Sequence, residues 1–167
     1  MLNIALTNLG KYNEGFLVYK WLSLPATDEE IKNTLKEIGI GPEYEEYFIS
    51  DYETDTGLEI GEYDNLEELN EKAARLEELT ETEKEIITAL LSDGFTFDDA
   101  LDKLDDVIYY DDCHDMADVA RYETEELGIH EIPEWLANYI DYEAMGRDMS
   151  YEGHFIGTEN GYIHILY

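Results

Sequence analysis

Acidic side chains outnumber basic ones so heavily that any fold of this chain must carry an unbalanced surface. The 167 residues include 42 Asp and Glu against 10 Lys and Arg, for a formal net charge of −32. Segments 1–63, 64–106 and 107–167 carry −9, −11 and −12, so the charge covers the whole chain. A disordered acidic tail would concentrate it at one end, whereas 44% of the residues are hydrophobic and periodically arranged. We therefore expect a folded protein with an extremely acidic surface.

The same imbalance excludes several classes of protein. A nucleic-acid-binding protein needs cations that replace phosphate counterions, and a protein held on anionic lipid needs a basic patch; the sequence shows neither. No apolar run approaches the roughly 20 residues of a membrane span, and we expect no signal peptide, because the N-terminus lacks a basic region and a long apolar region. The single Cys113 fits a reducing cytoplasm.

The charge can be compared directly with that of DNA. B-DNA carries one negative charge per about 1.7 Å of axis, so a net charge of −32 corresponds to about 54 Å of duplex. A compact globule of this length has a diameter of roughly 40 Å. A sphere would exceed the linear charge density of DNA and a rod would about match it. Since self-repulsion also favours extension, we expect an elongated chain.

Segment 1–63 has the pattern of a small α+β unit. Thr27 and Glu30 form a capping box before apolar residues at helical spacing, and Gly39 supplies the stop. Asn8 to Gly10 reads as a turn. Three stretches have strand composition: residues 3–6, 15–22 and 47–50.

Segment 64–106 changes to helical periodicity. Three capping residues each precede an amphipathic stripe, which predicts three short helices packed as a small bundle: Asn65, Thr80 and Thr96.

Segment 107–167 mixes both patterns. Residues 107–110 have strand composition, and residues 115–127 have helical periodicity. Pro133 fits the first position of a helix that runs on to Ile140. Asn160-Gly161, between two short strand-like stretches, is the strongest short signal for a β-hairpin. The whole sequence therefore predicts an elongated α+β chain of three small domains: residues 1–63, 64–106 and 107–167.

Residues 51–62 resemble a calcium-binding loop, with acidic residues at loop positions 1, 3, 5 and 12. The Gly needed at position 6 is replaced by Thr56, and Gly57 comes one residue late. The segment that enters the loop has strand rather than helix composition. A solvated acidic loop is the plainer interpretation.

Residues 111–115, Asp-Asp-Cys-His-Asp, suggest a metal cluster or an activated thiolate. They are contiguous, whereas a metal site needs ligands that converge from separate elements. The many acidic neighbours would raise the pKa of the Cys113 thiol. We expect instead the N-terminus of a helix, capped by Asp112 or Asp115.

Other signs of catalysis or metal binding are weaker still. His154 and His164 would be cross-strand neighbours on the hairpin, but two ligands make no zinc site, and His130 stands apart. The sequence has no G-x-S-x-G, H-E-x-x-H or Walker motif. Carboxylate pairs are so frequent that they say little about acid–base catalysis. We predict no enzyme, no cofactor and no metal.

Several segments go beyond composition and share the order and spacing of one protein family: Asn8 to Gly15 followed by Trp21 and Pro25, Glu45 to Tyr47, Asp51 to Glu53, Asp118 to Tyr122, and Asn138 to Tyr142 running on to Asp148. In these segments the chain resembles the ArdA antirestriction proteins over essentially its whole length. The helices of segment 64–106 fit the family in character more than in sequence.

The resemblance implies a function that spacing cannot show. ArdA proteins are encoded on conjugative plasmids and transposons, and they inhibit type I restriction-modification enzymes of a new host by occupying the DNA-binding groove. The family implies an elongated three-domain monomer that pairs through its third domain into a curved dimer imitating bent B-DNA, with no catalysis. We therefore expect a cytoplasmic homodimer that binds the methyltransferase core, without nucleic acid, membrane or cofactor.

The expected interaction surface is distributed, with carboxylates in place of phosphates. Residues four apart on a helix lie about 6 Å apart, near the scale of phosphate spacing. Dimer contacts are expected in the third segment, at Tyr139, Ile140, Asp141 and Tyr142 and at the end hairpin. The representative phosphate mimics are Glu43, Glu45, Glu46, Asp51, Glu53, Glu67, Glu71, Asp98, Asp99, Asp102, Asp111, Asp112, Asp115, Asp118, Glu123 and Glu126.

Rival functions stay open at this point. The chain could be an acidic mimic directed at another DNA-binding protein, or a calcium-binding acidic protein. It could also be an ordinary protein from a halophile, which should unfold at low salt, whereas a mimic should stay folded and bind best there.

Overall fold

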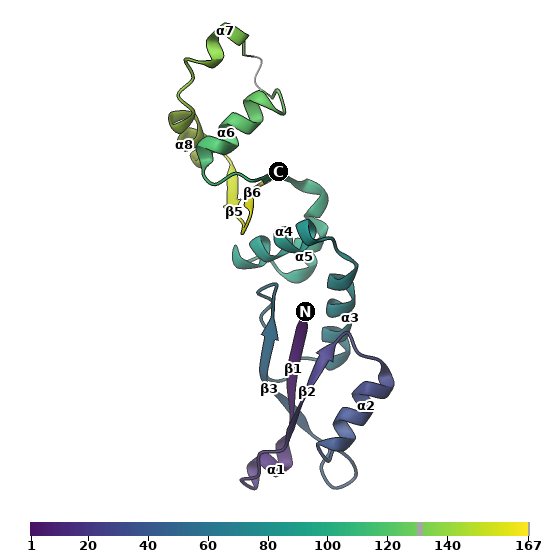
Figure 1. Ribbon diagram of the computed structural model, residues 1–167. Helices are drawn as coiled ribbons and strands as arrows, with labels where there is room; N and C mark the ends of the chain where they lie inside the picture. The colour runs from purple at the N-terminus through teal and green to yellow at the C-terminus, as the bar shows by residue number, and fades with distance from the viewer. Residues whose placement is uncertain (130–131, 167) are drawn as a thin grey trace. The chain divides into compact units, whose positions relative to one another are not determined.

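The computed structural model describes residues 1–129 and 132–166, apart from the side chain of Glu134. Contacts divide the chain into two compact units, residues 1–84 (unit 1) and 85–167 (unit 2), which Figure 1 shows in successive colours. Each unit holds one antiparallel three-stranded sheet together with helices, which confirms the α+β class. The division into three domains and the elongated form stay predictions, and His130 lies outside the described residues.

The sheet of unit 1 is built around β1 (Leu2–Asn8), flanked by β2 (Tyr19–Leu24) and β3 (Tyr47–Thr54). These are the three strands expected from the sequence, although β2 begins at Tyr19 rather than Gly15. Side chains alternate across a strand, and both faces of β1 are covered, since Ala5 and Thr7 are buried as well as the residues of the other face. Leu2, Ile4 and Leu6 are at most 2% exposed.

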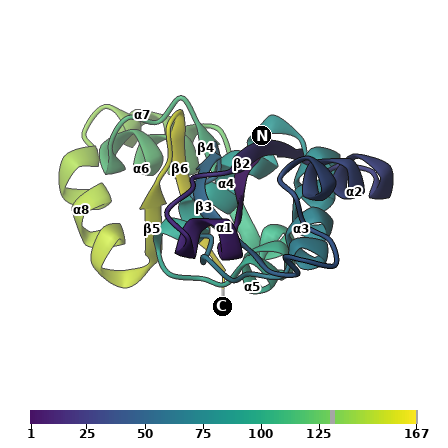
Figure 2. The same ribbon diagram turned by 90° about the horizontal axis from the view of Figure 1, so that it is seen from below.

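Helices α2 (Asp28–Glu37) and α3 (Leu66–Glu78) both contact β2, and Figures 1 and 2 show them together on one side of the sheet. The predicted capping box of α2 is present, with Thr27 and Glu30 bonding each other's backbone. The turn expected at Asn8 is instead the start of a short helix, α1 (Leu9–Asn13). The Asn8 side chain caps it by accepting a hydrogen bond from Lys11 N at 2.9 Å.

The middle helices begin where the capping residues predict. Asn65 caps α3, Thr80 precedes α4 (Glu81–Ser92), and Thr96 caps α5 (Phe97–Asp102), which leads into the 3₁₀ helix η1 (Leu104–Asp106). Since α3 falls in unit 1 and α5 in unit 2, their packing as one bundle stays a prediction. None of the helices among the described residues combines the length and the apolar character that a membrane span requires.

The sheet of unit 2 has the order β4 (Val107–Asp111), β6 (Gly161–Ile165) and β5 (His154–Gly157). The predicted hairpin is confirmed: β5 and β6 pair antiparallel, and Thr158 N donates to Gly161 O at 2.9 Å across the turn. A Cβ at Gly161 would lie 2.0 Å from Tyr110 O, so only glycine fits where β6 passes β4.

The helices of unit 2 differ from the prediction at one place. Helix α6 (Met116–Glu125) is present as expected, but the helix after Pro133 stops early, as α7 (Glu134–Ala137). A further helix, α8 (Tyr142–Glu152), was not predicted from the sequence. The Asp141 side chain caps it by accepting a hydrogen bond from Ala144 N at 3.0 Å. Gly146 is its one fully buried residue, while Tyr142, Met145 and Met149 on the same face are half-buried.

The two hairpin histidines are not cross-strand neighbours, which corrects the prediction. His154 pairs with Ile165, and His164 pairs with Phe155, so the two histidines lie on opposite faces of the sheet. His154 faces Asp93, with Nε2 to Oδ2 at 2.9 Å. His164 stacks on Phe155 with ring centroids 4.1 Å apart. The register therefore places the His154 and His164 rings on opposite sides of the sheet.

The prediction for Glu123 is also corrected, because this residue is buried and does not belong to the predicted phosphate-mimic surface. Only 6% of it is exposed, and it accepts a hydrogen bond from the fully buried Tyr110 hydroxyl at 2.6 Å. Its position on the inner face of α6, beside Val119 and Ala120, draws it into the unit 2 core. A buried carboxylate needs such a donor, which the sequence pattern did not reveal.

Substitution of Gly146 by Ala should loosen the contact between α6 and α8. A Cβ there would lie 2.1 Å from Met116 O, a backbone atom that cannot move away alone. We expect a loss of about 1–3 kcal/mol in the free energy of unfolding, measured with urea by circular dichroism. Gly41→Ala is the control, since nothing lies within 4 Å of its Cβ position; equal stability of the two variants would contradict the close packing.

Substitution of Tyr110 by Phe should cost about 1–3 kcal/mol at pH 7, because it removes the donor to buried Glu123. Burial, and then the hydrogen bond to Glu123, raise the pKa of the Tyr110 phenol above its usual 10.0. Its contribution is therefore complete below about pH 10 and declines at higher pH, as the unfolded chain loses this proton first.

Urea titrations of the unsubstituted protein and the Tyr110→Phe variant should show a smaller difference in the free energy of unfolding at pH 11 than at pH 7. Tyr151→Phe, at a residue that is 81% exposed, should match the unsubstituted protein at both values. A gap of the same size at pH 11 would show that the phenol proton is not what stabilises the pair.

Candidate functional site

The candidate functional site is the acidic surface of both units. Unit 1 has 21 acidic and 7 basic residues, and unit 2 has 21 and 3. Even if every Lys and Arg neutralised one carboxylate, the excess of 32 would remain. Several ion pairs join residues three apart on the surface, such as Lys84–Glu81 at 2.8 Å and Arg121–Asp118 at 3.3 Å. Such exposed pairs are weak and leave the field of the excess charge in place.

Most of the predicted phosphate mimics of unit 1 and unit 2 are exposed. The structure exposes fourteen of the sixteen: Glu43, Glu45, Glu46, Asp51, Glu53, Glu67, Glu71, Asp98, Asp99, Asp102, Asp111, Asp112, Asp115 and Glu126. Asp118 is half-buried, and Glu123 is buried in the core. Exposure supports a surface role for the fourteen, while their role as phosphate mimics stays a prediction.

In unit 1, two different elements place carboxylates at regular spacing. Asp51 and Glu53 stand two residues apart on β3 and therefore share a face of the strand, roughly 7 Å apart. Glu67 and Glu71 stand one turn apart on α3, opposite its buried stripe, at about 6 Å. Both elements thus hold their carboxylates in rows: on α3 the opposite side is committed to the core, whereas this part of β3 is exposed on both faces.

In unit 2, the acidic residues around the start of α6 serve partly as caps. The Asp115 side chain accepts hydrogen bonds from Ala117 N and Asp118 N at 2.8 and 2.9 Å. Asp118 accepts from His114 N at 3.1 Å and faces Arg121. This confirms the expected helix N-terminus, with Asp115 as its cap.

The capping boxes keep further carboxylates charged. Hydrogen bonds from the Thr27 backbone and then its side chain lower the pKa of Glu30. Hydrogen bonds from the Thr80 side chain and then its backbone do the same for Glu83. Glu30 is exposed and Glu83 is half-buried, so both carboxylates reach the negative surface while they stabilise the starts of α2 and α4.

The alternative chemistries find little support in the described residues. Cys113 is 5% exposed, and burial, followed by Asp118 and other acidic neighbours, raises the pKa of its thiol. In the proposed calcium loop, Asp51 and Glu53 belong to a strand, and Asp55 pairs with the N-terminal amine, so they do not converge. Among the described side chains, no three of His, Cys, Asp and Glu gather as a metal site.

The residues predicted for dimer contacts have different surroundings. Tyr139 is 80% exposed, while Ile140 is half-buried. Asp141 caps α8, and the Tyr142 hydroxyl donates to Glu125 at 3.0 Å while the Arg121 guanidinium lies over its ring. The contiguous segment is thus divided into an exposed part and an internally bonded part.

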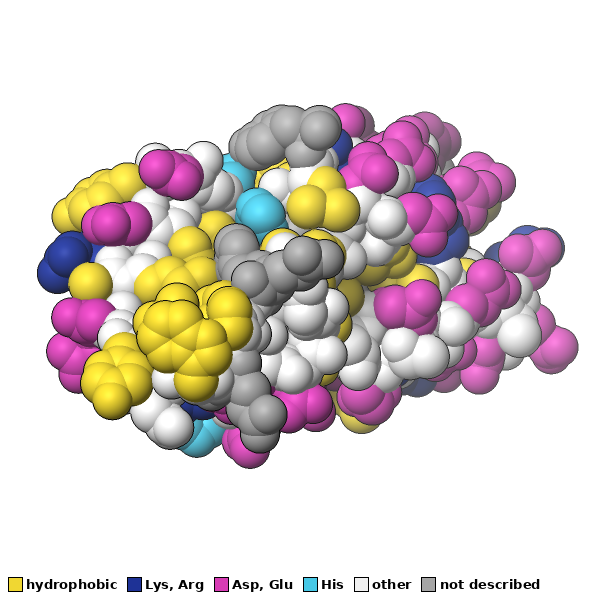
Figure 3. Space-filling model, turned by 90° about the horizontal axis from the view of Figure 1, so that it is seen from above, with side chains coloured by type: hydrophobic (Ala, Val, Ile, Leu, Met, Phe, Trp, Pro, Cys, Tyr) yellow, Lys and Arg dark blue, Asp and Glu magenta, His cyan; other side chains and the backbone are white. Residues whose placement is uncertain are grey.

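Three further apolar residues near Tyr139 in the sequence are also exposed. Trp135 is 72% exposed, and Ile129 and Leu127 are 51% and 45% exposed. Figure 3 shows hydrophobic side chains gathered on the side of the view where α7 and α8 lie. The sequence feature that could have indicated these exposed residues is the uncharged run at residues 135–140 in a highly charged chain.

One comparison with known proteins identifies a family for this chain. The family model described as antirestriction protein (ArdA) matches residues 4–164, almost the whole chain. A search of curated proteins gave no match. With its family segments in order and its carboxylates displayed on both units, the chain belongs to the ArdA family of antirestriction proteins.

Proposed function

We propose that this protein inhibits type I restriction-modification enzymes in the cytoplasm by occupying their DNA-binding groove as a mimic of duplex DNA. The observation that carries the proposal is the set of exposed carboxylates on both units, which the few basic residues cannot neutralise. Membership in an antirestriction family supports the same conclusion.

The mechanism follows from the electrostatics of a DNA-binding groove. Such a groove is basic, because it must replace the counterions of a duplex. An acidic protein surface satisfies the same cations and is steered toward them at long range. Contacts to phosphates carry no sequence information, so a mimic of the backbone alone escapes sequence specificity. One inhibitor can therefore act on related enzymes that recognise different sequences.

The role requires binding rather than catalysis. Displacement of duplex DNA from the methyltransferase core would block every later step, and no covalent change in either protein is needed. Because the carboxylates are redundant, their contributions should be small individually and cumulative.

Stepwise neutralisation tests the distributed charge. Glu43, Glu45 and Glu46, then Asp51 and Glu53, then Glu67 and Glu71 are changed to their amides in cumulative variants. Competition against a fluorescent duplex on a type I methyltransferase core should show affinity falling about twofold per carboxylate. The dependence of log K on log salt should become shallower at each step.

The matched control changes exposed uncharged residues, such as Asn13 and Asn33, to Ala and should keep full affinity. Loss of all binding after one amide substitution, with no effect of the others, would contradict a distributed surface. Failure of the unsubstituted protein to displace the duplex would remove the proposed function itself.

We also propose that two copies pair through the exposed apolar side chains of Leu127, Ile129, Trp135 and Tyr139. At a net charge of −32, like charges oppose self-association. The uncharged run 135–140, with Trp135 and Tyr139 open to solvent, gives the contact an apolar centre where this repulsion is least.

Trp135→Ala combined with Tyr139→Ser should convert a dimer into a monomer in sedimentation velocity at micromolar concentration. Higher salt should strengthen the dimer, since it screens the repulsion. Tyr151→Ser is the control, because Tyr151 is equally exposed but lies on α8. An unchanged dimer in the double variant would place the interface elsewhere.

A further inference from the structure

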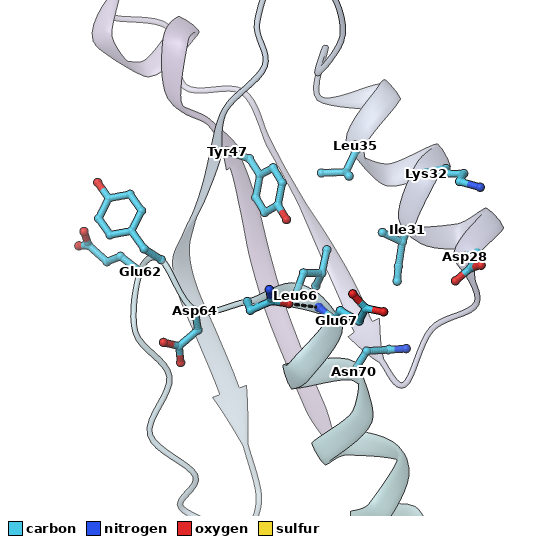
Figure 4. Close-up of a pocket in the computed structure, with 12 residues that line it drawn as sticks. Asp28, Ile31, Lys32, Leu35, Tyr47, Glu62, Asp64, Leu66, Glu67 and Asn70 are labelled. Atoms are coloured by element: carbon cyan, nitrogen blue, oxygen red, sulfur yellow. Dashed lines mark hydrogen bonds between the residues drawn. The ribbon is translucent and has the colours of Figure 1, made fainter.

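Unit 1 has an open groove of about 690 Å³ between α2 and the segment that leads into α3. Figure 4 shows its lining side chains. The groove combines an apolar floor with acidic edges: its lining residues are Asp28, Ile31, Lys32, Leu35, Tyr47, Glu62, Tyr63, Asp64, Asn65, Leu66, Glu67 and Asn70.

The floor is apolar and comes from three elements. Ile31 and Leu35 stand one turn apart on α2 and are half-buried, so part of each side chain stays open. Tyr47 begins β3, and Leu66, in the first turn of α3, is only 6% exposed. In Figure 4 these side chains point toward one another across the groove. The core of unit 1 does not fully cover this surface.

The edges carry negative charge. Figure 4 shows Glu62 and Asp64 on one side of Leu66, and Asp28 and Glu67 on the other. Lys32 is the one basic residue among the lining side chains. The four carboxylates therefore frame the apolar floor with a net negative potential, and a cationic occupant is favoured over a neutral or acidic one.

Hydrogen bonds made by two of its lining residues hold the groove in shape. The Asn70 side chain accepts from Ala26 N at 2.7 Å and donates to Ala26 O at 3.0 Å, which ties α3 to the start of α2. Asn65 caps α3 through Glu67 N and Glu68 N. Because its walls are fixed, the groove can accept a side chain without first paying to order them.

We propose that this groove receives an apolar side chain flanked by Lys or Arg from a partner protein. The partner is the basic DNA-binding groove of the proposed function, on which this inference rests. Tyr47 and Tyr63 add aromatic faces that attract such cations. Duplex DNA offers no corresponding apolar socket, so this contact lets the protein compete with DNA by more than charge.

The contact differs from phosphate mimicry in its response to salt. Ion pairs on a surface are screened as ionic strength rises, whereas burial of apolar area is not weakened by salt. Removal of the apolar floor should therefore lower affinity by the same factor at low and high salt.

The test variant is Ile31→Gln with Leu35→Gln, which keeps charge and helix propensity. Binding to a type I methyltransferase core should weaken about tenfold at both 50 mM and 300 mM salt, which is the loss expected when an interface loses an apolar anchor. The slope of log K against log salt should stay unchanged. Leu17→Gln, at a residue 65% exposed in unit 1 outside the groove, should bind as the unsubstituted protein does.

Unchanged affinity of the folded double variant would overturn the inference while leaving the proposed function intact. A loss that vanishes at high salt would also overturn it, because the contact would then be electrostatic. If the unsubstituted protein displaces no DNA, the proposed function fails instead.

A second measurement needs no variant. A ten-residue peptide with Leu between Arg residues is titrated into the ¹⁵N-labelled full chain, with an acidic peptide as control. Saturable amide shifts centred on residues 31, 35, 47 and 66 support the groove as the site. Non-saturating shifts spread over the acidic surface, or shifts at these residues on concentrating the protein alone, would overturn the assignment to a basic partner.

Discussion

The structure depends on where a large excess of like charge can be placed without preventing folding. Self-repulsion acts against every compact arrangement, and hydrophobic burial must exceed it in each unit. Several amphipathic helices meet this constraint by giving one side to the core and the other to carboxylates. In α3 the buried residues Leu69, Ala73 and Leu76 stand opposite Glu67 and Glu71. The same division that permits folding also arranges the acidic residues in rows, so the fold and the acidic surface have one cause.

The elements that obey local rules could be predicted from the sequence. Capping residues at Thr27, Asn65 and Thr96 mark the starts of their helices, because a side-chain oxygen satisfies backbone amides within the same turn. The hairpin at Asn160-Gly161 follows from turn geometry in the same way. These features require only residues that are close together in the sequence.

The parts that depend on distant neighbours could not be predicted. Glu123 has the sequence context of a surface acid, and the Tyr110 hydroxyl that bonds it in the core comes from a residue on a different element. Helix α8 depends on the close approach of Gly146 to Met116 and on the packing of Met149 against the core of unit 2. The faces of His154 and His164 depend on a register one residue from the expected one. The groove of unit 1 likewise joins residues from three segments.

The capping carboxylates have a consequence for recognition. Asp115 is held by two backbone amides, and Glu30 and Glu83 are held in capping boxes. A flexible acidic side chain loses rotamer freedom when a cation orders it, but these three are already ordered by the fold. A partner that meets them gains their charge at a smaller entropic cost. The caps therefore make part of the acidic surface rigid, as the phosphates of a duplex are fixed by its sugars.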